Sequence, residues 1–301
     1  MKFSKPSFST EQQIALLNER GLSIPDPQNA SHYLRHISYY RLRAYWLPLE
    51  VEHPNDTDHC FADGASFEDA LALYVFDREL RLLVMDAIER IEVSVRGHWS
   101  YHLAMKYGSH GYLRPENYLR ADRFATAFSS LIEETERSKD TFVKHYKRKY
   151  GDPEHLPIWM ASEVMSLGHL SKWLGNLKLR SDRQAIARAY GLDEKVLVSV
   201  THHLTYVRNI CAHHSRLWNK QFTVTMTVPT NPAALSMAMN SSTDRLLYNT
   251  LVVIGYLMDV IAPGSGWRTR LILLRDSCPL APDTAMGFPD GWRDLAAWKK
   301  P

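Results

Sequence analysis

Three polar side chains near the end of one apolar stretch have the chemistry needed to attack a phosphate ester. The stretch covers residues 201–219 and contains Arg208, Asn209 and His213. Arginine offers phosphate oxygens a planar fork that is always charged, and imidazole exchanges a proton near neutral pH. Because RNA carries its own nucleophile, the 2′-hydroxyl, a base and an anion clamp of this kind can cleave RNA without a metal ion.

The spacing of the three residues determines how a helix would present them. Asn209 and His213 are four positions apart and would share a face, whereas Arg208 would lie about 140° around the helix from His213. The same residues also fit a structural interpretation, in which Arg208 bridges helix ends in a buried network and the His213 ring bonds a backbone carbonyl. Both interpretations are open on the spacing alone.

The sequence around the trio resembles a known family. Residues 208–213 are similar to the Arg-polar-x-x-x-His signature of the HEPN superfamily of metal-independent ribonucleases. Residues 208–219 resemble the block that marks the Abi-like (AbiD/AbiF) proteins of phage abortive infection. Four further segments resemble blocks of that family, and with them the resemblance covers nearly the whole chain: 37–46, 90–96, 157–171 and 287–292.

The resemblance implies a fold, a function and a site. The fold is an all-α, HEPN-like helical bundle with additional helices and at most a small β-hairpin. The function is a toxin-like endoribonuclease of anti-phage defence, which cleaves RNA to a 2′,3′-cyclic phosphate with Arg208, Asn209 and His213 as catalytic residues. Neither a cofactor nor a metal ion is implied. A catalytically silent RNA-binding or protein-interaction scaffold of the same fold is the alternative.

The resemblance also implies partners. In-line transfer needs a base at the attacking oxygen and an acid at the leaving oxygen, whereas one motif supplies one arginine and one histidine. HEPN ribonucleases are thought to combine two motifs across a dyad, so we expect a homodimer with the helices around residues 208–213 juxtaposed. A small-RNA or protein antitoxin would restrain the activity.

Two residues beside the motif are candidates for accessory roles. His214 is either a second active-site group or a residue that stabilises the helix end. Arg216 either binds phosphate further along an RNA strand or extends along the surface with only its stem buried.

Three more accessory candidates lie earlier in the chain. Arg96 and His102 fit a loose second Arg–His pair, although Glu92 is placed one helical turn before Arg96 and favours an ion pair instead. Glu163 either pairs with a basic residue of the site or forms a salt bridge elsewhere.

The elements that must position these residues are mostly helices. The apolar spacing of threes and fours predicts helices over 9–21, 29–47, 67–107, 116–138, 140–150, 158–168, 171–179, 182–190, 193–218 and 243–261. Residues 222–228 alternate between large apolar side chains and threonine, which predicts a short strand. Residues 51–64 are polar and predict a surface loop. We expect a single domain over 1–301, with an internal boundary near 108–115 and the motif-bearing part at 116–261.

Composition excludes few functions. The 301 residues include 36 Lys and Arg against 33 Asp and Glu, and the resulting formal charge of +3 does not by itself indicate a nucleic-acid-binding protein. Basic residues cluster at 144–150 and 172–188, either as solvated helix faces or as RNA-facing ones. The odd number of separated cysteines favours a cytoplasmic location. The longest apolar run, 246–261, is too short to span a membrane.

Overall fold

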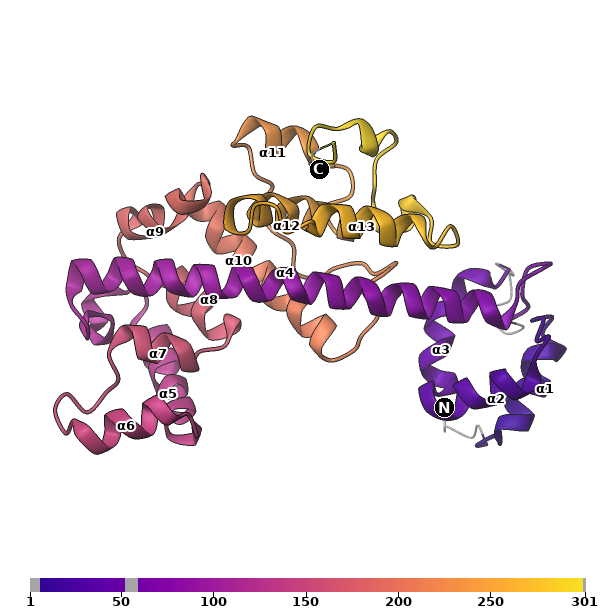
Figure 1. The fold of residues 1–301 in the computed structure, drawn as a ribbon, viewed down its shortest axis with the longest axis horizontal. Helices are drawn as coiled ribbons and strands as arrows, with labels where there is room; N and C mark the ends of the chain where they lie inside the picture. Colours follow the sequence, from indigo (N-terminus) through magenta and orange to yellow (C-terminus); the bar gives the residue numbers. More distant parts are fainter. Residues whose placement is uncertain (1–5, 52–58, 300–301) are drawn as a thin grey trace. The chain divides into compact units, whose positions relative to one another are not determined.

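The regular structure of the chain is helical (Figure 1). The computed structural model describes residues 6–51 and 59–299, so half of the loop expected at 51–64 lies outside the described residues. No β-strand occurs in those two ranges, and the predicted all-α class is confirmed. The α-helices are α1 (Thr10–Glu19), α2 (Pro27–Ile37), α3 (Tyr39–Trp46), α4 (Phe67–Tyr107), α5 (Ala121–Arg137), α6 (Thr141–Lys149), α7 (Ile158–Val164), α8 (Leu167–Gly175), α9 (Arg180–Ala187), α10 (Glu194–Ala212), α11 (Ala233–Ala238), α12 (Leu247–Ile261) and α13 (Trp267–Asp276).

The chain divides into two compact units. The first unit comprises residues 1–81 and 272–282, and the second comprises 82–271 and 283–301. Helices α4 and α13 each contribute residues to both units. The boundary expected near residues 108–115 falls inside the second unit, so it does not coincide with this division, and the single-domain assignment stays a prediction. Every candidate site residue belongs to the second unit.

The first unit is built around the short helices α1, α2 and α3. Helix α1 begins with a capping box, in which Ser9 and Gln12 each accept a hydrogen bond from the other's backbone N–H. The single helix expected over 29–47 is two helices, because Ser38 takes a left-handed conformation (φ 78°) and its side chain caps α3. The break lets both helices turn apolar side chains, Leu34 and Trp46 among them, into one core.

A buried polar group lies inside the first unit. Tyr45 on α3 donates a 2.7 Å hydrogen bond to Asp77 on α4, and Arg81 pairs with the same carboxylate. Burial raises the pKa of the Tyr45 hydroxyl, which therefore stays protonated and keeps donating. The hydrogen bond connects α3 to the start of α4.

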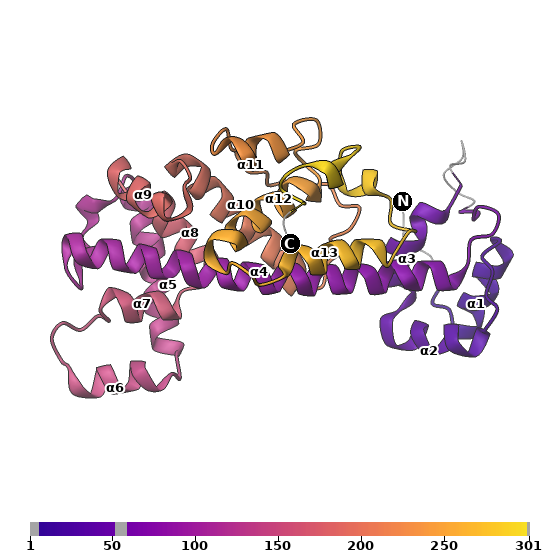
Figure 2. The ribbon, with the colours of Figure 1, turned by 45° about the horizontal axis from the view of Figure 1, so that its top comes forward.

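The second unit is arranged along the C-terminal part of α4. Helices α5, α6 and α7 lie on one side of α4, and α9, α11 and α12 lie on the other, as both views show (Figures 1 and 2). The face of α4 that points into the core carries Ile91, Val95 and Trp99 at intervals of four residues. The Trp99 ring is part of an edge-to-face aromatic cluster with Tyr112 and Trp173.

Helix α8 packs closely and antiparallel on α10. A Cβ at Gly168 would lie 3.2 Å from Thr205 Cγ2, and a Cβ at Gly175 would lie 3.3 Å from Val198 Cγ1. Gly168 was expected to end a helix over 158–168, and that prediction is wrong. The chain instead breaks before Ser166, whose side chain caps α8, and the two glycines lie within α8 where the absence of a side chain permits the close contact.

Residues 222–228 form no strand, contrary to the prediction, and the chain bends at residues 223–224. Their backbone groups bond to side chains of α10 in place of a partner strand. The Thr227 amide donates to Ser199 Oγ at 2.8 Å, and the Val224 carbonyl lies 2.8 Å from Nδ1 of His203. His203 is buried, and this segment and Thr250 bond both of its ring nitrogens.

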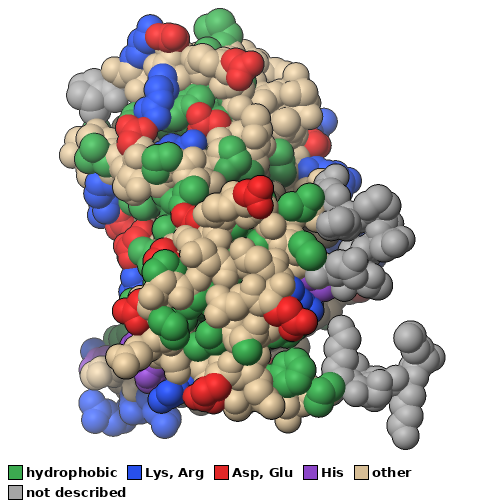
Figure 3. All heavy atoms as spheres, turned by 90° about the vertical axis from the view of Figure 1, so that its right-hand side faces the viewer, with side chains coloured by type: hydrophobic (Ala, Val, Ile, Leu, Met, Phe, Trp, Pro, Cys, Tyr) green, Lys and Arg blue, Asp and Glu red, His purple; other side chains and the backbone are tan. Residues whose placement is uncertain are grey.

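The surface carries charges of both signs. On the face shown in Figure 3, acidic and basic side chains are mixed and separated by apolar and neutral groups. The formal charge of +3 is therefore not gathered on this face. Among the described helices, none combines the length and apolarity that crossing a bilayer requires.

Candidate functional site

The predicted trio lies at the C-terminal end of α10. Arg208 and Asn209 belong to the last turn and a half of the helix, and His213 is its C-cap, with its N–H donating to the Asn209 carbonyl at 3.0 Å. The helix expected to continue to about residue 218 ends at Ala212. His214 is left-handed (φ 56°) and closes the helix in a Schellman motif, with 3.0 Å from the His214 amide to Cys211 and 2.9 Å from the Ser215 amide to Ile210.

The end of α10 presents the trio to solvent. Asn209 and His213 are exposed, and Arg208 is partly buried. Within the described residues, Arg208 donates one long hydrogen bond, 3.4 Å to Asn209 Oδ1. The exposure of the His213 ring is incompatible with the buried network considered above. The catalytic roles of the trio stay a prediction.

A cluster of charged side chains connects α10 to two other segments. Arg96 on α4 lies 2.7 Å from Glu92, donates a 3.0 Å hydrogen bond to the Met165 carbonyl and lies 3.6 Å from Glu163. Burial raises the pKa of Glu92, although the nearby guanidinium groups of Arg96 and Arg208 lower it. The segments 90–96, 157–171 and 208–219, singled out separately in the sequence, therefore meet here.

This cluster assigns a structural position to Arg96. Its side chain is 13% exposed and is held by Glu92 on the same helix and by the turn between α7 and α8. The intrahelical ion pair expected as the alternative is thus present. Arg96 holds the α7–α8 turn through the Met165 carbonyl, and an accessory role for Arg96 in the site stays a prediction.

His102 lies in a different cluster from Arg96. Its Nε2 is 3.0 Å from Asp182, which also accepts a 2.6 Å hydrogen bond from Tyr107 and pairs with Lys106. Although burial acts to raise it, these three donors hold the pKa of the Asp182 carboxyl below its ordinary value. The structure does not bring Arg96 and His102 together as a second catalytic pair.

The remaining accessory candidates lie near the trio. Glu163 is exposed and faces Arg96 at 3.6 Å, so its basic partner is Arg96 and not Arg208. Arg216 donates a 3.1 Å hydrogen bond to the Asn219 carbonyl and braces the loop that follows α10. His214 is exposed in the Schellman turn. Its helix-end role is visible in the geometry, and a second active-site role stays a prediction.

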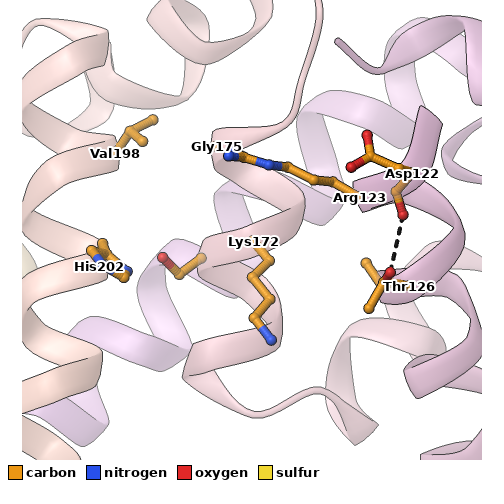
Figure 4. Close-up of a pocket in the computed structure, with 9 residues that line it drawn as sticks. Asp122, Arg123, Thr126, Lys172, Gly175, Val198 and His202 are labelled. Carbon is orange, nitrogen blue, oxygen red and sulfur yellow. Dashed lines mark hydrogen bonds between the residues drawn. The ribbon is translucent and has the colours of Figure 1, made fainter. Parts of the chain in front are cut away.

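Sequence analysis missed a cavity of about 550 Å³ between α5, α8 and α10 (Figure 4). Arg123 extends from α5 toward Gly175 of α8, and Lys172 and His202 line the same opening. The three basic side chains come from three helices. Lys172 lies in a basic cluster noted above, but no spacing within the sequence could have joined it to Arg123 and His202.

The fold and the helix end define an all-α protein in which α10 ends on an exposed amide and an exposed imidazole, with a partly buried arginine beside the amide. The family described as Abi-like protein matches residues 32–219, more than half of the chain, and the protein belongs to this family. The match ends at the last residue of the motif block, and the block at 287–292 lies outside it. Comparisons with curated proteins and with solved structures found no match.

Proposed function

We propose that the protein is a HEPN-type endoribonuclease that cleaves RNA without a metal ion and acts in abortive-infection defence. The observation that carries the proposal is the exposure of Asn209 and His213 on one face at the end of α10, with Arg208 next to them. Membership of the Abi-like family supports the defence role. A cytoplasmic location and restraint by a small-RNA or protein antitoxin belong to the same proposal.

The mechanism uses the nucleophile of the substrate. The ribose 2′-oxygen attacks the adjacent phosphorus while the His213 imidazole accepts the 2′-hydroxyl proton. Arg208 bonds the phosphoryl oxygens and offsets the negative charge that grows on them, and the Asn209 amide donates a further hydrogen bond. The bond from phosphorus to the 5′-oxygen breaks, and that oxygen takes a proton from an acid. The products are a 2′,3′-cyclic phosphate and a 5′-hydroxyl.

A second copy of the chain supplies the acid in this scheme. One α10 carries one catalytic imidazole, and Arg208 and His213 lie about 140° apart around its axis. A homodimer that juxtaposes two α10 ends places one histidine at the attacking oxygen and the other at the leaving oxygen. A mixed dimer of wild-type and His213→Ala chains keeps only one of the two histidines, so in this scheme it should lose cleavage.

Growth arrest on expression tests the proposal. We expect wild-type protein to arrest growth and purified protein to cleave single-stranded RNA in the presence of EDTA, with 2′,3′-cyclic phosphate ends. Arg208→Ala and His213→Ala should abolish both effects, whereas the exposed controls Arg188→Ala and His36→Ala should retain them. Equal behaviour of all variants would support the silent scaffold, and a requirement for added divalent metal would refute the mechanism.

A further inference from the structure

The cavity between α5, α8 and α10 carries positive charge at its opening. Arg123, Lys172 and His202 are exposed there. Asp122 is the acidic side chain among the lining residues, and Arg120 pairs with both of its oxygens at 2.9 and 2.8 Å. The Asp122 charge is therefore largely offset by a neighbour outside the cavity, and the opening favours an anionic ligand.

The same cavity has an apolar wall. Ala127 and Val198 line it, and the α8 face between them carries Gly175 in place of a larger side chain. Because a Cβ at Gly175 would lie 3.3 Å from Val198, any larger residue there would fill the space. The volume of about 550 Å³ lies within the range of small-ligand sites. A cavity with an apolar wall and cations at its opening suits a nucleotide, in which a flat base is joined to a phosphate.

The cavity and the motif share one face of α10. Val198, His202, Asn209 and His213 are separated by four, seven and four positions, which places all four within about 60° around the helix. Asn209 is about 10 Å along the axis from His202, at 1.5 Å per residue. The groups that line the cavity therefore continue along α10 to Asn209 and His213, two members of the trio.

We propose that this cavity is a nucleotide subsite for single-stranded RNA next to the phosphate held at Arg208 and His213. Lys172 and Arg123 each bind a phosphate of the strand, and a base stacks on the His202 ring and packs against Val198. This inference rests on the proposed function, because RNA at the trio is what carries the strand across the cavity. The subsite holds the strand and performs no chemistry.

Binding of a fluorescein-labelled single-stranded RNA of about 12 nucleotides, followed by anisotropy at several salt concentrations, tests the subsite. The full chain carries His213→Ala so that the probe stays intact. Lys172→Ala with Arg123→Ala should lower the affinity about tenfold and make the salt slope shallower by about 1.4, the value for two lost phosphate contacts on a single strand. The matched control, Lys139→Ala with Arg114→Ala, removes two exposed cations outside the cavity and outside the basic clusters, and it should change neither.

His202 supplies the second arm of the test. His202→Ala should weaken binding several-fold, and His202→Phe should restore it, because a phenyl ring also stacks on a base. Equal losses in the cavity and control variants, or an unchanged salt slope, would overturn the subsite. Free AMP that binds as tightly as the RNA would overturn the assignment to an RNA strand.

Cleavage of the same RNA by the wild-type chain separates the two proposals. If the wild-type chain cleaves the RNA but the cavity variants bind it as tightly as the control variant does, the subsite proposal is wrong and the ribonuclease proposal stands. Cavity-dependent binding without cleavage overturns the ribonuclease activity and leaves a nucleotide site on a silent RNA-binding protein.

Discussion

Replacing Asp182 by asparagine tests whether His102 is structural. The Asp182 side chain is 3% exposed and receives His102, Lys106 and Tyr107 from the end of α4. Asparagine keeps the size of the side chain and one acceptor oxygen but loses the charge and the second acceptor. We expect the second unit to lose stability while the exposed trio on α10 stays in place.

The size of the loss follows from the three contacts. Hydrogen bonds to a buried charged group contribute about 1.5–3 kcal/mol each. The loss is smaller than their sum, because asparagine still accepts one bond and the 37%-exposed Lys106 side chain can return to water. We therefore expect about 2–4 kcal/mol, which lowers the melting temperature of a unit of this size by about 5–12 °C.

The same contacts give the stabilisation a definite pH dependence. The pKa of Asp182 is lower in the folded chain than its ordinary value, so the unfolded chain binds a proton at higher pH than the folded chain does. The stabilisation is complete above about pH 4, the ordinary range for aspartate, and is lost as the pH falls below it. The stability difference between wild type and Asp182→Asn should therefore shrink under acidic conditions.

Chemical unfolding at about pH 7, 5 and 3.5 measures this difference. The control is Glu133→Gln, which removes an exposed i,i+4 ion pair with Arg137 and should cost less than about 0.5 kcal/mol. A wild-type melting temperature for Asp182→Asn, or a difference that stays constant to acid pH, would refute the reasoning. If His102→Ala abolishes RNA cleavage while the protein stays folded, His102 has a role in the site beyond its bond to Asp182.

Three further substitutions probe other contacts. Tyr45→Phe removes the 2.7 Å hydrogen bond to Asp77 and should destabilise the first unit by about 1–2 kcal/mol, measured by thermal unfolding. Gly168→Leu forces α8 away from Thr205, since even a Cβ would lie 3.2 Å from it, and should cost about 1–3 kcal/mol in the same assay. His214→Gly relieves a left-handed conformation and should raise stability by about 0.5–1 kcal/mol; loss of RNA cleavage at unchanged or higher stability would show that His214 is an active-site group.

The long helices could be predicted from the sequence because their signals are local. Helix α4 was expected over 67–107 and occupies Phe67–Tyr107, since its apolar pattern is unbroken and Ser66 caps it in hydrogen bonds with Asp69. The break at Ser38 could not be predicted in this way. The apolar pattern continues through it, and the left-handed Ser38 is stabilised by how α2 and α3 pack in the first unit.

In the candidate site, too, the local features could be predicted from the sequence and the long-range contacts could not. Arg208, Asn209 and His213 lie within one turn and a half of chain, so their proximity could be predicted from spacing. The partner of His102 lies 80 residues away on α9, and the cavity draws on α5, α8 and α10. Such contacts depend on how the helices pack against one another. That packing cannot be predicted from the residue types and spacings of one sequence.

The charges around Arg208 indicate why two arginines, Arg96 and Arg208, lie near Glu92 where α4, the α7–α8 turn and α10 meet. Glu92 is buried enough that its pKa is raised, and Arg96 at 2.7 Å is the partner that keeps it bonded. Glu163, 56% exposed, contributes little to the balance because water screens it. Glu92 is bonded to Arg96. Of the two guanidinium groups at this junction, that of Arg208 is therefore the one whose positive charge is less offset by a carboxylate of the protein. It lies beside the exposed Asn209, and this position supports the proposed role of Arg208 as a phosphate ligand.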